Sequence, residues 1–339
     1  MPNRIHRSAR VEDRLDMLIA RVLRRRGWRP RVLPYTSYGT DGWVRVLARV
    51  LLTPPGTRRQ DIETGRGWRR FFSAPVSGVA VTVIVGGRVH EVHSARGGYL
   101  DTRVPAVLPP GWTTIRLSAE GSPVAKAAAR VVGPKSRLGL VCDVDDTIMI
   151  TALPRPLLAF WNTFVRRETH RRPVPGMADF LHRTLAGDGF IAYLSTGPWN
   201  VAPALESFRS RQGLPAGPFL LTDWGPTTEG WFRSGREHKR SELRRLLADL
   251  PQLQWVLVGD DGQHDPELYE ELAAAAPERV KAIAIRQLTP AEQVLTHGTP
   301  EPLTDRPSAP SREPCPAPVL RAPDGRGLLA EFRQGGLLG

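Results

Sequence analysis

The sequence predicts a chain of the α/β class, in which a domain with a doubly wound parallel sheet follows an all-β, sandwich-like domain. Its 339 residues, 41% of them hydrophobic, suffice for about two globular domains. Residues 34–134 contain short alternating apolar runs separated by glycine and proline turns, a pattern typical of antiparallel strands. Residues 135–290 instead alternate continuous apolar runs with helical patterns, which indicates buried parallel strands joined by helices.

The first segment, residues 1–33, is predicted to contain a basic amphipathic helix over about residues 11–26. Apolar residues recur there at helical spacing, and arginines occupy much of the remaining helix surface. Residues 1–31 hold ten arginines against three acidic residues, a local charge of +7. Two interpretations stay open: the helix packs on its own protein with a solvated basic face, or it lies on an anionic membrane.

Within the α/β domain, each expected element has its own signal. Strands are expected where apolar residues run together, at 138–142, 190–194, 255–258 and 280–285. Helices are expected between them, at 176–185, 201–212, 238–250 and 266–276. The final segment, residues 291–339, is rich in proline and is expected to be disordered.

The formal charge of +13 comes almost entirely from arginine and draws the chain towards anionic surfaces. No run of about 18 apolar residues suggests a transmembrane helix, and the N-terminus lacks the apolar core of a secretory signal. Cys142 lies in an expected buried strand and Cys315 in the proline-rich tail, so a disulfide is not expected. We therefore expect a cytoplasmic protein, with peripheral attachment to the inner membrane face as an open alternative.

Polar residues with catalytic potential follow the ends of the expected strands. Because the carboxyl ends of parallel strands meet at one edge of a sheet, these residues are expected to lie close together. They come from four separate segments and comprise Asp143, Asp145, Thr147, Ser195, Thr196, Lys239, Asp260, Asp261 and Asp265.

These residue types suit phosphoryl transfer. Clustered carboxylates repel one another unless a hard cation lies among them, and Mg²⁺ prefers oxygen ligands. A carboxylate can attack phosphorus and split the reaction into two steps, while Asp145 could protonate the leaving alcohol and then activate water. Lys239 and Ser195 could hold phosphate oxygens. Lys239 could also be an ordinary surface lysine, and Asp265 could simply cap the helix that Pro266 opens.

The pattern at Asp143, Asp145 and Thr147 resembles motif one of the haloacid-dehalogenase-like superfamily. Ser195 fits motif two, Lys239 fits motif three, and the segment 259–265 fits motif four. The wider context, in segments 142–148, 195–200 and 259–269, is similar to the catalytic domain of actin-patch-type phosphatidate phosphatases, which are relatives of lipins. This resemblance covers about residues 137–290.

The resemblance implies Mg²⁺-dependent hydrolysis of phosphatidate to diacylglycerol and phosphate through an aspartyl phosphate. It implies that Asp143 is the nucleophile, that Asp145 is the general acid and base, and that Asp260 holds the metal with Asp143 and the backbone carbonyl of Asp145. Asp265 is preferred over Asp261 as the second acid of motif four near the metal. Phosphate binding is assigned to Thr147, Ser195, Thr196 and Lys239, although Thr196-Gly197 departs from the Asn-Ser that members often carry.

The insertion between motifs one and two bears on the substrate. About 28 residues separate Thr147 from Pro175, which is too short for a folded cap domain, so we expect a small cap and an open site. Its apolar and basic residues between 157 and 172 could contact a lipid, or could form a small internal helix. Phosphatidate at anionic membrane surfaces is thus the expected partner, and nucleic acid is not. A non-lipid phosphoester and a non-catalytic adaptor for anionic surfaces are the alternatives.

Overall fold

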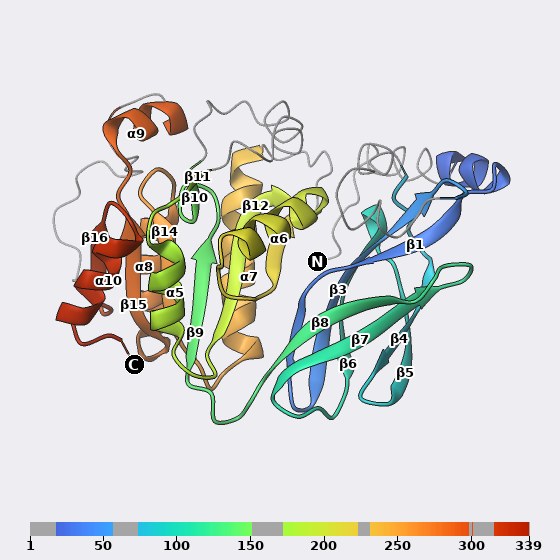
Figure 1. The fold of residues 1–339 in the computed structure, drawn as a ribbon, viewed down its shortest axis with the longest axis horizontal. Coiled ribbons are helices and arrows are strands. Elements are labelled where there is room, and N and C mark those ends of the chain that lie inside the picture. Colours follow the sequence, from blue (N-terminus) through green and yellow to red (C-terminus); the bar gives the residue numbers. More distant parts are fainter. Residues whose placement is uncertain are drawn as a thin grey trace. The chain divides into compact units, whose positions relative to one another are not determined.

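The computed structural model describes residues 18–56, 74–150, 172–222, 231–297, 300 and 315–338. The chain divides into two compact units, one running to Pro134 and the other starting at Lys135. Figure 1 shows the strands of the first unit in blue to green and the sheet of the second in green to red. The insertion residues 151–171 and the expected helical positions 11–17 lie outside the described residues.

The first unit is an eight-stranded sheet with the order β1-β3-β2-β8-β7-β4-β5, and β6 pairs with β3. All pairs are antiparallel except β2 with β8. The sequence predicted a sandwich-like domain. In the structure, all eight strands belong to one hydrogen-bonded sheet, because the eleven-residue β3 is long enough to pair with β1, β2 and β6. The strands are β1 Arg29–Pro34, β2 Ser37–Thr40, β3 Trp43–Thr53, β4 Ala80–Val85, β5 Arg88–His93, β6 Tyr99–Pro105, β7 Gly111–Ala119 and β8 Ala125–Val132.

Residues 18–25 are helical and precede β1. Ala20 is buried in the core of the first unit, and Leu23 packs against that core. Alternating residues of the strands supply the rest of the core, as expected for strands with one buried face. This core joins the short helix to the sheet.

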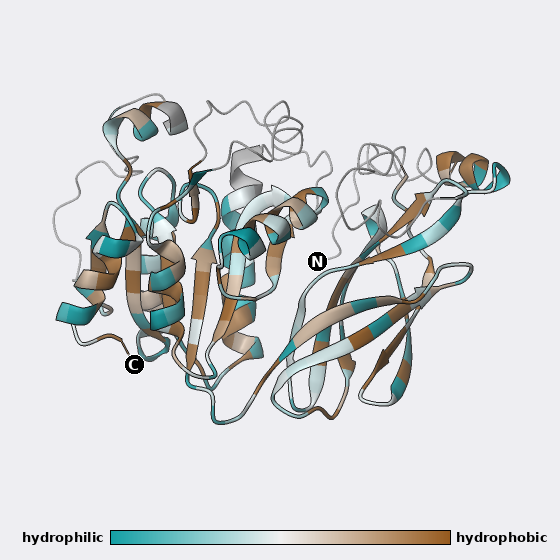
Figure 2. Cartoon of the chain, in the orientation of Figure 1, coloured by the Kyte–Doolittle hydropathy of each residue, from teal (hydrophilic) through white to brown (hydrophobic). Residues whose placement is uncertain are grey.

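The second unit contains a six-stranded sheet with the order β13-β12-β9-β14-β15-β16, in which every pair is parallel. The prediction of an α/β chain with a parallel sheet is confirmed. Apolar residues run through these strands without a polar alternation, as brown and white segments show in Figure 2, because both faces of the sheet are covered. The strands are β9 Leu138–Asp143, β12 Phe190–Pro198, β13 Phe219–Thr222, β14 Gln254–Asp260, β15 Val280–Arg286 and β16 Val319–Ala322.

Helices connect these strands. The described part of the unit also contains two short strands and two 3-10 turns. The short strands, β10 Met149–Ile150 and β11 Arg172–Pro173, pair with each other. The helices are α5 Met177–Leu185, α6 Ala202–Arg211, α7 Trp231–Asp249, α8 Asp265–Ala275, α9 Pro290–His297 and α10 Gly325–Gln334. The remaining 3-10 turns are η1 Arg96–Gly98 in the first unit, and η3 Trp199–Val201 and η4 Pro277–Arg279 in the second.

The expectation that residues 291–339 are disordered is wrong for residues 291–297, which belong to α9, and for residues 315–338. Strand β16 pairs with β15, and α10 follows it with Asp324 as N-cap, whose side chain accepts hydrogen bonds from the amides of Arg326 and Gly327. Phe332 is fully buried and packs edge-on against Phe180 of α5, with 5.0 Å between ring centroids. Apolar residues at helical spacing after the cap outweighed the proline-rich composition. Residues 301–314 lie outside the described residues.

Among the described residues, no helix combines the length and the apolar character needed to cross a membrane.

The order of the strands in the second unit indicates where a ligand would bind. β9 has β12 on one side and β14 on the other, so the chain order reverses at β9. In parallel sheets, ligands bind beyond the carboxyl ends of the strands that flank such a reversal.

Candidate active site

The carboxyl end of β9 begins the site. Asp143 is its last residue, and Asp145, Asp146 and Thr147 follow in a tight loop. The amide of Asp146 donates to the carbonyl of Met149 at 2.8 Å, and Asp146 has a φ of 58°, in the left-handed region that asparagine and aspartate tolerate better than most residues. The loop therefore turns sharply and leaves both Asp143 and Asp145 at the sheet edge.

The neighbouring elements bring the other predicted residues to the same edge. Ser195 lies in β12, Asp260 ends β14, Asp265 opens α8, and Lys239 lies on α7. The parallel strands and the helices that follow them thus bring the four predicted segments together. The members that the structure buries are Asp143, Asp145, Thr147, Ser195, Lys239, Asp260, Asp261 and Asp265.

Lys239 is not a surface lysine. It is 4% exposed, and its Nζ lies 2.6 Å from Asp143 Oδ1 and 2.6 Å from Asp265 Oδ1. Burial by itself lowers the pKa of Lys239, but the attraction of Asp143 and Asp265 outweighs it and raises that pKa above the ordinary value. Lys239 is consequently an ammonium ion held between two carboxylates.

Three carboxylates meet around this lysine. Asp143, Asp260 and Asp265 each offer an oxygen atom within 4.8 Å of the others. Burial is the main cause that raises the pKa of Asp143 to about 8, and burial with the charges of Asp265 and Asp143 raises the pKa of Asp260 well above its ordinary value. One lysine cannot balance three buried carboxylates, so this cluster favours an additional positive charge.

The residues present fit a divalent cation such as Mg²⁺. All donors in the cluster are carboxylate oxygens, which this hard cation prefers. Asp265 Oδ2 is buried and has no hydrogen-bond partner among the described residues, although its other oxygen holds Lys239. Thr147 Oγ1 lies 3.2 Å from Asp143 Oδ2 and 3.3 Å from Asp260 Oδ2, so its single proton can serve either carboxylate. Asp143 and Asp260 are the residues best placed to hold the cation.

Asp145 has different surroundings. Its Oδ2 accepts a hydrogen bond from Ser195 Oγ at 3.2 Å, and Ser195 Oγ in turn accepts one from the amide of Gly197 at 3.0 Å. The side chain of Asp145 is not one of the three clustered carboxylates. The expected parts of the Asp145 carbonyl in metal binding and of its carboxyl group in proton transfer stay predictions.

Asp261 and Asp265, the two candidates for the second acid of motif four, have different surroundings. Asp261 Oδ1 accepts hydrogen bonds from the amide of Leu288 and from Gln293 Nε2, both at 2.8 Å, and so holds the segment after β15. Asp265 faces Lys239 and Asp143 instead. The N-cap of α8 is His264, so the interpretation of Asp265 as a simple helix cap is wrong. The preference for Asp265 as the second acid of motif four stays a prediction, which this geometry supports.

Thr196 stands somewhat apart from the cluster. It is half-buried, its methyl group lies against Gly235 of α7, and its carbonyl accepts a hydrogen bond from Thr222 Oγ1 at 2.9 Å. These contacts fix the segment after Ser195, and a direct role of Thr196 in phosphate binding stays a prediction.

Sequence reasoning did not find Arg286, the last residue of β15. Its Nη1 donates to the carbonyl of Asp146 at 2.6 Å, and its Nη2 pairs with Glu292 at 2.7 Å. Thr296 Oγ1 also approaches Asp146 Oδ2, at 3.4 Å. Arg286 thus ties the loop after the proposed nucleophile to α9. The only signal in the sequence was its place directly after the expected strand 280–285.

Comparisons with known proteins agree with this geometry. Residues 138–287 match the family model described as the phosphatidate phosphatase APP1 catalytic domain, and all the predicted site residues lie within that range. The chain is 27% identical over 152 residues to the phosphatidate phosphatase APP1 of Saccharomyces cerevisiae, which is 44% of this chain and 26% of that protein. It is 24% identical over 155 residues to an uncharacterized protein of Schizosaccharomyces pombe, which is 45% of this chain and again 26% of the relative.

The matched segment thus spans about a quarter of the length of each of these relatives. Among solved structures, a carbohydrate acetylesterase from Xanthomonas citri shows a TM-score of 0.27 at 12% identity, over 76% of this chain and 68% of the other. A likeness of that size does not describe the fold of this chain.

Proposed function

We propose, from the match of residues 138–287 to the catalytic-domain model of the phosphatidate phosphatase APP1, that the chain hydrolyses phosphatidate to diacylglycerol and phosphate. The observation that carries the proposal is the buried Lys239, paired at 2.6 Å with both Asp143 and Asp265 beside Asp260. An adaptor for anionic surfaces has no need of such a costly set of buried charges. The order of these residues along the chain supports a haloacid-dehalogenase-like domain.

In the first step that we propose, a carboxylate oxygen of Asp143 attacks the phosphorus and the bond from phosphorus to the glycerol oxygen breaks. Lys239 and Thr147 hold the two oxygens of Asp143 and thereby orient it. Asp145 gives its proton to the leaving glycerol oxygen. The products of this step are diacylglycerol and a phosphoryl group bound to Asp143.

In the second step, Asp145 takes a proton from water, the water oxygen attacks phosphorus, and Asp143 is released with free phosphate. Ser195 donates its one hydroxyl proton to Asp145 and so orients that acid; to hold a phosphate oxygen, it would turn this proton from Asp145 to the phosphate. Bound Mg²⁺ would supply the positive charge that keeps Asp143 and Asp260 ionised and that offsets charge on the phosphoryl oxygens. Lys239 adds a second positive charge at the same place.

The substrate assignment also gives the expected partner and location. Phosphatidate is presented at an anionic membrane surface, which suits a chain of net charge +13 and an attachment at the inner membrane face. We do not expect nucleic acid to be a partner of the chain. The proposed small cap lies mostly in residues 151–171, outside the described part of the chain.

The test is a substrate panel with purified protein and Mg²⁺, comparing phosphatidate in mixed micelles with soluble sugar phosphates, phosphopeptides and nucleic-acid ends. We expect phosphatidate to have the largest kcat/KM and the release to stop in EDTA. A clear preference for a soluble phosphoester would preserve the chemistry but overturn the lipid assignment. No release from any substrate would overturn both.

A further inference from the structure

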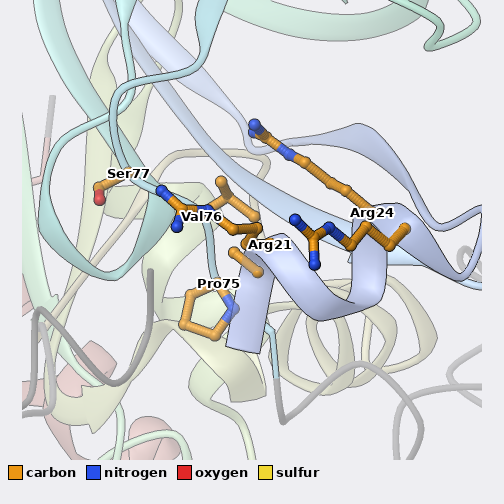
Figure 3. Close-up of a pocket in the computed structure, with 7 residues that line it drawn as sticks. Arg21, Arg24, Pro75, Val76 and Ser77 are labelled. Carbon is orange, nitrogen blue, oxygen red and sulfur yellow. The ribbon is translucent and has the colours of Figure 1, made fainter. Parts of the chain in front are cut away.

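A second feature lies in the first unit, whose residues take no part in the candidate active site. The helix 18–25 and the segment 75–77 enclose a pocket of about 510 Å³. Arg21, Arg24 and Arg25 line it from the helix, and Pro75 and Val76 line it from the opposite side. Figure 3 shows the side chains of Arg21 and Arg24 projecting from the helix, with Pro75 and Val76 beside them.

This pocket is built on the rigid part of the unit. The amide of Leu52 donates to the carbonyl of Ala74 at 3.0 Å, and the amide of Val76 donates to the carbonyl of Val50 at 3.3 Å, so the segment is fixed to β3. Ala20 and Leu23 fix the helix to the same core. Neither wall depends on the arginines, and their guanidinium groups are therefore available to a ligand.

Within the described part of the chain, the arginines of the pocket have no acidic partner. Arg21, Arg24 and Arg25 are exposed, and none of them forms an ion pair with a residue in the described part of the chain. The seven described residues that line the pocket include no carboxylate. Three guanidinium groups in one place, with no described carboxylate paired to them, suit a ligand that carries several negative charges.

A row of exposed apolar residues lies on the same helix. Leu18 is 56% exposed, Val22 is 47% exposed and Ile19 is 37% exposed. Leu18 and Val22 are four residues apart and so lie on one side of the helix, next to Arg25 and opposite Ala20 and Leu23, which face the core. This helix therefore presents two exposed strips, one apolar and one basic, and Figure 2 shows brown and teal together on it.

We propose that these two strips form a docking site for an anionic phospholipid bilayer, with lipid headgroups at Arg21, Arg24 and Arg25 and with Leu18, Ile19 and Val22 inserted among the acyl chains. Basic residues beside aliphatic ones are typical of helices that lie in the membrane interface. Nucleic acid offers phosphates too, but it offers no aliphatic layer for the apolar strip. The site needs no catalysis and stands even if the candidate active site acts on another phosphoester.

The test is flotation of the full chain with vesicles of phosphatidylcholine alone and of phosphatidylcholine mixed with an anionic phospholipid. We expect binding only to the anionic vesicles. Replacing Arg21, Arg24 and Arg25 by glutamine should weaken partitioning on the order of 100-fold, since each basic residue near an anionic surface contributes about fivefold. The double variant Leu18→Ser and Val22→Ser should also weaken binding to the vesicles. Its loss should be largest at high salt, because salt screens the charge of the arginines and leaves the apolar contacts to hold the chain.

The matched control replaces three other exposed basic residues of the same unit, Arg88, Arg116 and Lys126, by glutamine and so removes the same charge. Thermal unfolding shows that each variant is folded, and hydrolysis of a soluble phosphoester separates docking from catalysis. Equal losses in the control and in the pocket variant would overturn the proposal, because net charge would then explain binding. Tighter binding of duplex DNA than of anionic vesicles, lost in the pocket variant alone, would also overturn it.

Discussion

At the scale of single residues, the candidate site is a problem of charge balance. Asp143, Asp260 and Asp265 bring three carboxylates into a buried space that contains one ammonium group, that of Lys239. Burial disfavours the charged form of Asp143 and of Asp260, and the pKa of Asp143 consequently rises to about 8. The arrangement is poorly balanced without a cation, and this imbalance is what makes it suited to binding one.

Removing Lys239 should impair catalysis strongly. Lys239→Gln keeps a polar side chain of similar length but takes the only ammonium group from between Asp143 and Asp265. We expect kcat/KM for phosphatidate to fall by about 10²- to 10³-fold, as when a group that stabilises transition-state charge is lost. Lys126→Gln, at an exposed lysine of the first unit, is the control and should change kcat/KM little.

Replacing Asp260 should stabilise the metal-free protein. Its pKa is raised in the folded state by burial and by Asp265 and Asp143, so the folded chain binds more protons than the unfolded one at neutral pH. Stability from this group is therefore lost as pH rises above the ordinary carboxyl pKa. In EDTA, the free energy of unfolding of Asp260→Asn should exceed that of wild type by on the order of 1 kcal/mol, and by more at pH 8 than at pH 6. Thermal unfolding at both pH values measures this difference.

The comparison is repeated with Mg²⁺ present. Wild type should then gain stability and Asp260→Asn should gain much less, because the variant lacks one proposed ligand. An Asp260→Asn protein that is less stable than wild type in EDTA at both pH values would contradict this view of the site.

At the scale of elements, the segment after β15 supports the loop after β9. Arg286 contacts the carbonyl of Asp146 and the carboxylate of Glu292, and Asp261 holds Leu288 and Gln293. The ends of β14 and β15 are thus connected through the start of α9. Since Asp146 directly follows Asp145, a shift of this loop would move the proposed acid.

Arg286→Gln tests this connection. We expect kcat for phosphatidate to fall roughly tenfold to a hundredfold with KM nearly unchanged, because the loop is displaced while the phosphate contacts stay in place. Kinetics at saturating Mg²⁺ measure both constants, and Arg88→Gln on the exposed edge of the first unit is the control. A rise in KM with an unchanged kcat would assign Arg286 to substrate binding instead.

The elements also show what sequence patterns can predict here. Four continuous apolar runs predicted β9, β12, β14 and β15, because strands covered on both faces need apolar residues at every position. The four-residue β13 and β16 were missed, since their runs are short. Arg286 was missed as well, because an arginine at the end of a strand carries no motif, and its partner Asp146 becomes apparent only in three dimensions.

At the scale of the whole molecule, the chain combines two units with different chemical surfaces. The unit that starts at Lys135 contains every residue of the proposed catalytic site, and the unit that ends at Pro134 contains the proposed lipid-docking site. Docking and hydrolysis are therefore separable by mutation. Their combination would suit an enzyme whose substrate is part of a membrane, because surface binding raises the local concentration of substrate.

The measurement that tests the central claim most directly is the initial rate of phosphate release from phosphatidate micelles by wild type and by Asp143→Asn. We predict Mg²⁺-dependent release by wild type and a fall of at least about 10³-fold in Asp143→Asn, because an amide cannot accept the phosphoryl group. Asp179→Asn, at an exposed carboxylate on α5, should retain the wild-type rate. Absence of Mg²⁺-dependent release by wild type, or release by Asp143→Asn at the wild-type rate, would contradict the account.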